Sequence, residues 1–69
     1  PEKSHVEIAV YNLLGQKVAT LFDGVRKPGL YKAVWNGRDQ NGREVGGGMY
    51  FIQMRAKNFH QNKKVVLLR

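Results

Sequence analysis

Five acidic side chains are the groups in this sequence that could act as general acids or bases: Glu2, Glu7, Asp23, Asp39 and Glu44. None of them lies in an apolar stretch, where burial would tune a carboxyl group for proton transfer. Asp39 and Glu44 flank a turn signal and could pair in space as acid and base. The same spacing is more typical of turn capping at a solvated strand end, and we adopt that interpretation.

Nucleophiles and metal ligands are equally sparse. The sequence has no cysteine, His5 and His60 lie near opposite ends, and Ser4 has no nucleophile-elbow pattern around it. Residues 36–42 contain the oxygen-bearing side chains of a calcium loop but lack its alternating Asp rhythm and closing Glu. The glycines of 42–48 are not followed by the Gly-Lys-Ser/Thr of a phosphate-binding loop. We therefore predict no catalytic residue, no metal site and no cofactor, and we do not expect an enzyme.

The net charge is the most marked feature of the composition. Twelve Lys and Arg against five Asp and Glu give +7, which favours anionic partners such as nucleic acid, acidic glycans or lipopolysaccharide. The basic residues are scattered along the chain, and only Arg26-Lys27 and Lys63-Lys64 stand together. A solvated surface that keeps the chain soluble is the simplest explanation of this distribution.

Aromatic residues beside basic ones would suit a nucleic-acid-binding β-barrel. Alternation along the expected strands, however, places Tyr31, Trp35 and Tyr50 on inward faces. Only Phe51 is expected outside, with Arg55 near it. Nucleic-acid binding is therefore a third and disfavoured function.

Short alternating stretches separated by glycines predict the fold class. A chain of 69 residues is enough for one small domain, which we place at 1–69. Strands are expected at residues 6–11, 16–22, 30–35, 49–56 and 63–68. No stretch keeps helical spacing for three turns, and no apolar run approaches the roughly 20 residues of a membrane-spanning helix. The prediction is an all-β, small antiparallel β-sandwich or barrel.

The same patterns predict the strand faces and the turns. Inward positions are expected to carry Val6, Ile8, Val10, Tyr50, Ile52, Met54 and Ala56. The last strand, 63–68, is apolar on both faces, which is typical of a central or covered strand. Turns are expected at residues 12–15, 23–29, 36–48 and 58–62. Gly15 is expected to take positive φ, Asn41-Gly42 is a two-residue hairpin signal, and glycines 46–48 should lead into the long strand.

Three motifs carry a resemblance to a known family. They are Val-x-Ile-x-Val-Tyr-Asn-x-x-Gly-Gln-x-Val-x-x-Leu at 6–21, Pro-Gly-x-Tyr-x-x-x-Trp-Asn-Gly-x-Asp-x-x-Gly at 28–42, and Gly-x-Tyr-Phe at 48–51, followed by Lys-Lys-Val-Val-Leu-Leu. The chain resembles the C-terminal sorting domains of type IX secretion, which are immunoglobulin-like β-sandwiches. It also resembles the immunoglobulin-like domain of flagellar hook-capping proteins.

The resemblance implies a non-catalytic C-terminal module of a larger exported protein, located outside the cell or at its surface. Its partners would be the outer-membrane export machinery and the cargo domain of the same chain. The positions that match the sorting motifs are Pro28, Gly29, Tyr31, Gly48, Tyr50, Lys63, Lys64 and Val65. The alternative is a passive structural or accessory module of the hook-capping type.

One departure from the family pattern carries its own expectation. Family members have an upstream segment with one or two further strands before the position of Val6, and this sequence begins at Pro1 without it. We therefore expect a truncated sandwich that lacks its N-terminal strand or strands. Because such a sandwich has an unpaired strand edge, we also expect association with a second copy through that edge.

Overall fold

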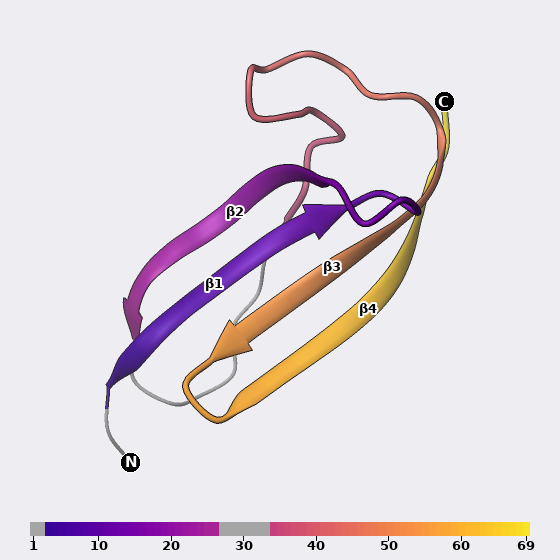
Figure 1. The fold of residues 1–69 in the computed structure, drawn as a ribbon. Helices are drawn as coiled ribbons and strands as arrows, with labels where there is room; N and C mark the ends of the chain where they lie inside the picture. The colour runs from indigo at the N-terminus through magenta and orange to yellow at the C-terminus, as the bar shows by residue number, and fades with distance from the viewer. Residues whose placement is uncertain (1–2, 27–33) are drawn as a thin grey trace.

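The computed structural model describes residues 3–26 and 34–69, and these residues form an antiparallel sheet. Its strands are β1 (Ser4–Tyr11), β2 (Lys17–Arg26), β3 (Gly48–Ala56) and β4 (Phe59–Leu67). They lie in the order β2-β1-β3-β4, and Figure 1 shows the loop after residue 33 at the end of the sheet where β3 begins. The described residues contain no helix, so none is present that could cross a membrane. The predicted all-β fold class is confirmed, and it is consistent with a small immunoglobulin-like domain.

The described strands form one sheet rather than the two layers of the expected sandwich. The strand expected at 30–35 falls mostly outside the described residues, and its last two residues, Val34 and Trp35, lie in a loop.

Alternation correctly predicted which face of the sheet is apolar. Val6, Ile8 and Val10 lie on one face of β1, which we call the core face, and are at most 7% exposed. Ile8 is paired with Met54 and Val10 with Ile52, so β3 contributes to the same face. Residues that stand directly opposite each other share a face, so Tyr11 and Phe51 belong to the other one, which we call the outer face.

Strand β2 is longer than predicted because Asp23-Gly24 is part of it and does not form a turn. Asp23 stands opposite Glu7, and its carboxylate contacts the imidazole of His5; Glu7 and His5 both lie on β1. Gly24 lies two residues after Phe22 on the same strand, and an added Cβ at Gly24 would lie 3.1 Å from the Phe22 ring. The glycine therefore leaves room for that ring to lie over the backbone of β2. Two register shifts, between Ile8 and Ala9 and after Val10, also make β2 an irregular strand with two bulges.

Strand β4 begins at Phe59, so the turn predicted at 58–62 is wrong. Ala56 pairs with Phe59, which leaves Lys57 and Asn58 as the connection between β3 and β4. The polar run His60–Asn62 continues as a strand because β4 borders the described sheet and most of its side chains face water. The last strand is therefore not central among the described strands, whereas its coverage by a partner stays a prediction.

Two turns share one hydrogen-bond pattern. In the first, Asn12 Oδ1 accepts hydrogen bonds from the backbone N–H groups of Leu14 and Gln16, and Gly15 N donates to Asn12 O. The second repeats this arrangement with Asp39 in place of Asn12 and Gly42 in place of Gly15. Both glycines have φ of 81°, as predicted for Gly15.

The tip of the second turn differs from the expected two-residue hairpin. No described residue other than glycine has positive φ, and a type I′ turn would require it at Asn41. The turn instead spans Asp39 to Gly42 and is closed by the Asp39 carboxylate.

Candidate functional site

The residues that match the sorting motifs fall into three groups. Pro28, Gly29 and Tyr31 lie outside the described residues. Gly48 and Tyr50 lie at the start of β3, and Lys63, Lys64 and Val65 lie in the second half of β4. Val65 stands opposite Tyr50, so the structure brings the second and third groups together on neighbouring strands.

Gly48 and Tyr50 have structural roles. Gly48 opens β3 with φ of 146°, a conformation that residues with a side chain rarely adopt. The Tyr50 ring meets the Trp35 ring edge to face, and its hydroxyl donates a 2.6 Å hydrogen bond to Gly46 O. Trp35 is half-buried, so the contact joins the loop to the sheet rather than filling a closed core.

Lys63 and Lys64 are adjacent in sequence, but their side chains lie on opposite faces. Lys63 stands opposite Ile52 on the core face, and Lys64 stands opposite Phe51 on the outer face. Both are exposed, and neither forms an ion pair with any residue of 3–26 or 34–69. The doublet therefore places one positive charge on each side of β4.

The two outermost described strands present different edges. Next to β2, Gln40 N donates to Val18 O at 3.0 Å, and Gln40 Oε1 accepts from Thr20 N at 2.9 Å. Gln40 thus occupies part of the place that a neighbouring strand would take. Within the described part of the chain, no comparable backbone hydrogen bond covers the side of β4 that faces away from β3. Of the two outer strands, β4 is thus the one whose edge the described residues leave open.

Arg69 fixes the loop beside the end of β4, a role that the sequence pattern did not indicate. Its Nε donates to Val45 O at 2.6 Å, a second guanidinium nitrogen donates to Gly37 O, and Nη1 lies 3.6 Å from Glu44 Oε1. These partners lie 24 to 32 residues away along the chain. No local sequence signal reports such a distant contact.

Asp39 and Glu44, the two residues considered as an acid and base pair, have structural partners. Asp39 closes its turn, as the capping interpretation predicted. Glu44 lies within 3.5 Å of Arg38 and 3.6 Å of Arg69. Among residues 3–26 and 34–69, no three His, Asp or Glu side chains gather as a metal site would require.

One exposed ion pair changes a proton affinity. Lys17 Nζ lies 2.7 Å from Glu7 Oε2 on the neighbouring strand. The hydrogen bond to the Glu7 carboxylate is the main cause that raises the pKa of Lys17 above its ordinary value of 10.5.

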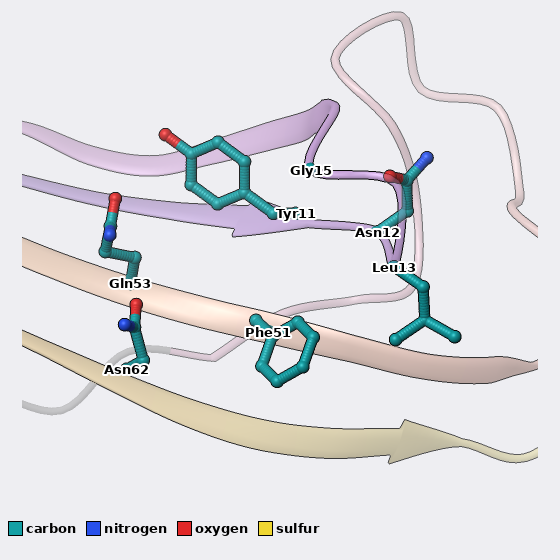
Figure 2. A pocket seen from close by; sticks show the side chains of 7 residues that line it. All are labelled: Tyr11, Asn12, Leu13, Gly15, Phe51, Gln53 and Asn62. Atoms are coloured by element: carbon teal, nitrogen blue, oxygen red, sulfur yellow. The ribbon is translucent and has the colours of Figure 1, made fainter.

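A groove of about 440 Å³ lies on the outer face, and its position was not predicted. Figure 2 shows the side chains that line it, from β1, β3, β4 and the first turn: Tyr11, Asn12, Leu13, Gly15, Phe51, Gln53 and Asn62. The alternation that put Phe51 and Gln53 outside was a usable signal. The strand order that places Tyr11 and Asn62 beside them was not available from the sequence.

Comparison with known proteins addresses the fold. The family model of the FlgD Ig-like domain matches residues 1–59, which include β1, β2 and β3 and end at the first residue of β4. Neither the curated proteins nor the solved structures gave a significant match. The predicted relation to the immunoglobulin-like domain of hook-capping proteins is confirmed, whereas the relation to type IX sorting domains stays a prediction. Since the match covers most of the sequence, this chain belongs to the FlgD Ig-like domain family.

Proposed function

We propose that this chain is a non-catalytic immunoglobulin-like module that sorts a larger exported protein to the cell surface through the type IX export machinery. The observation that carries the proposal is the edge of β4, which residues 3–26 and 34–69 leave open, with an exposed lysine on each face. Immunoglobulin-like domains typically serve as binding or structural modules rather than as catalytic domains, which agrees with this role.

The edge of β4 is suited to recognition by strand addition. An extended segment can pair with an open edge through backbone hydrogen bonds, and side chains beside the edge then give specificity. Lys63 and Lys64 would meet acidic residues of the incoming strand on both of its faces. The proposal therefore gives the two lysines a role in recognition that the fold does not require.

A second candidate is a passive accessory module of the hook-capping type, placed between or beside other domains. The family match favours it, because that match covers β1 to β3 and ends where β4 begins. For a passive module, β4 would complete the sheet and would not be read by an export receptor.

A reporter fusion separates the two candidates. The chain is attached to the C-terminus of a periplasm-directed reporter in a type IX-competent bacterium, and surface and medium fractions are assayed. The test variant carries Lys63→Glu and Lys64→Glu. The matched control carries Lys3→Glu and Lys57→Glu, which makes the same change in net charge at two other exposed lysines.

For a sorting module, the wild-type and control fusions reach the surface or medium, whereas the test variant stays in the periplasm. Thermal unfolding of the purified variants should be nearly equal, because substitutions of exposed charges change stability by about 0.5 kcal/mol or less. Periplasmic retention of the wild-type fusion would contradict sorting and support the passive module. Equal export of all three fusions would contradict a role for the two lysines.

A further inference from the structure

The outer-face groove is built on a regular grid of side chains. Along one row, Tyr11, Phe51 and Lys64 stand opposite one another on β1, β3 and β4. The next row consists of Ala9, Gln53 and Asn62. Rows on one face repeat about every 7 Å along a strand, and strands are about 4.8 Å apart. Ala9 is 1% exposed and does not line the groove, which in this row is lined by Gln53 and Asn62.

Two amides in this grid have hydrogen-bonding groups available to a ligand. Within the described part of the chain, neither Gln53 nor Asn62 has a side-chain hydrogen bond, and the two residues stand opposite each other on β3 and β4 (Figure 2). Each amide offers two N–H donors and a carbonyl acceptor. Asn12 is different, because its amide is already used inside the first turn. The groove thus combines apolar ring surface with a pair of unused amides.

Basic side chains lie beside the groove. No acidic residue lines it, Lys64 borders it opposite Phe51, and Arg55 occupies the next row. Two acidic residues share the row of Arg55, but each already has a partner: Glu7 forms an ion pair with Lys17, and Asp23 contacts His5. An anionic group beside Asn62 would therefore meet uncompensated positive charge.

We propose that this groove binds an acidic oligosaccharide, with carboxylate groups on its sugar rings. Sugar rings have apolar faces that pack on aromatic side chains such as Tyr11 and Phe51. Their hydroxyl groups exchange hydrogen bonds with amides such as those of Gln53 and Asn62. A carboxylate on the same ring pairs with Lys64. The groove volume lies within the range of about 300–1,000 Å³ that is usual for ligand sites.

The distribution of charge favours a glycan over a nucleic acid. Tight nucleic-acid binding relies on many phosphate contacts along one face. Here Lys63 is on the core face, and Arg38 and Arg43 are in the loop. The outer face near the groove offers mainly Lys64 and Arg55, which suits a ligand with few charges.

The binding test uses three probes on the isotope-labelled protein, followed by two-dimensional NMR. The first probe is a tetramer of galacturonic acid, the second is the same tetramer with its carboxylates methyl-esterified, and the third is a short oligothymidylate. The proposal expects saturable shifts at Tyr11, Phe51, Gln53 and Asn62 with the first probe. The ester should bind about two- to fivefold more weakly, as expected for the loss of one exposed ion pair.

Three variants locate the site without disturbing the core. Gln53→Ala with Asn62→Ala should abolish the saturable shifts, because it removes both unused amides. Lys64→Gln should weaken binding about two- to fivefold, whereas Lys63→Gln, its neighbour on the core face, should leave binding unchanged. Each variant is first shown to keep the wild-type spectrum outside the groove.

Other outcomes would overturn the proposal. Absence of shifts at millimolar tetramer would exclude the site, and equal binding of the ester would exclude the carboxylate contact. Tighter binding of the oligothymidylate, with shifts at the same residues, would assign the groove to nucleic acid instead. None of these results depends on whether the module is exported, so the failure of one proposal is distinguishable from the failure of the other.

Discussion

The rings of Trp35 and Tyr50 meet edge to face, with their centroids 4.9 Å apart and their planes at 66°. Each ring also holds the loop by a polar group, since Trp35 Nε1 donates to Arg38 O and the Tyr50 hydroxyl donates to Gly46 O. The pair therefore joins the loop to the first residues of β3. This contact gives a structural role to Trp35 and Tyr50, two residues of the sequence motifs.

We predict that Trp35 and Tyr50 are energetically coupled. Trp35→Ala should lower the free energy of unfolding by about 2–3 kcal/mol, less than a fully buried ring because Trp35 is half-buried. Tyr50→Phe should lower it by about 1 kcal/mol through loss of the hydrogen bond to Gly46. Urea unfolding of Trp35→Ala, Tyr50→Ala and the double mutant that combines them should give a coupling energy between the two rings of about 0.5–1.5 kcal/mol. Strictly additive effects would contradict the contact, and Val34→Ala, at a residue 76% exposed, is the control.

The two matching turns predict that glycine is required at their fourth residue. Gly15→Ala and Gly42→Ala should each destabilise the fold by about 1–2 kcal/mol, because an L side chain at φ of 81° is strained. An added Cβ meets no atom within 4 Å at either position, so the effect is one of backbone conformation alone. Gly46→Ala is the matched control, with equal space and no positive φ. Equal unfolding midpoints for all three variants would show that the turns do not have this geometry.

Arg69 should stabilise the loop through the shape of its guanidinium group. Arg69→Lys keeps the charge but cannot bridge Val45 O and Gly37 O, so we expect a loss of about 1–2 kcal/mol. The amide of Val45, which donates to Gly37 O, should exchange its hydrogen faster in this variant. Arg43→Lys is the control, because the Arg43 side chain has no such partners among residues 3–26 and 34–69. An unchanged hydrogen-exchange rate at the Val45 amide would contradict the stabilisation of the loop by the Arg69 hydrogen bonds.

The Lys17–Glu7 pair predicts a change at alkaline pH. Because the folded-state pKa of Lys17 is raised above 10.5, its contribution to stability is present below that value and is lost as the pH rises through the folded pKa. Glu7→Gln should lower the pKa of Lys17 toward 10.5, as followed by NMR titration of its side chain. Asp23→Asn removes a smaller cause of the shift and should lower the pKa less. A larger effect of Asp23→Asn would contradict the assignment of the shift to Glu7.

Much of the sheet could be predicted because it follows a local rule. The alternation through Val6, Ile8 and Val10 is sufficient to place a half-buried strand and to state which face is apolar. Gly15 was correctly expected to have positive φ because few other residues adopt it. Strand faces and a glycine with positive φ could be predicted from the sequence alone, because each depends on a single local preference.

The errors arose where neighbours in space changed a local preference. Asp23-Gly24 is a turn signal by itself, but pairing with β1 and the Phe22 ring keep it in a strand. Asn41-Gly42 belongs to a longer turn because the Asp39 carboxylate satisfies its backbone. The groove likewise depends on strand order, which brings Asn62 of β4 next to Gln53 of β3.

The inequality of the two sheet edges limits how copies of this chain could assemble. If two copies join through β4, that junction uses the strand side that the described residues leave open. The remaining outward strand, β2, has two bulges, and Gln40 already fills part of its margin. Such a dimer would present few free backbone hydrogen-bonding groups at its outer β2 edges. A third molecule could not readily add there, so assembly would stop at a dimer and would not extend into a fibre.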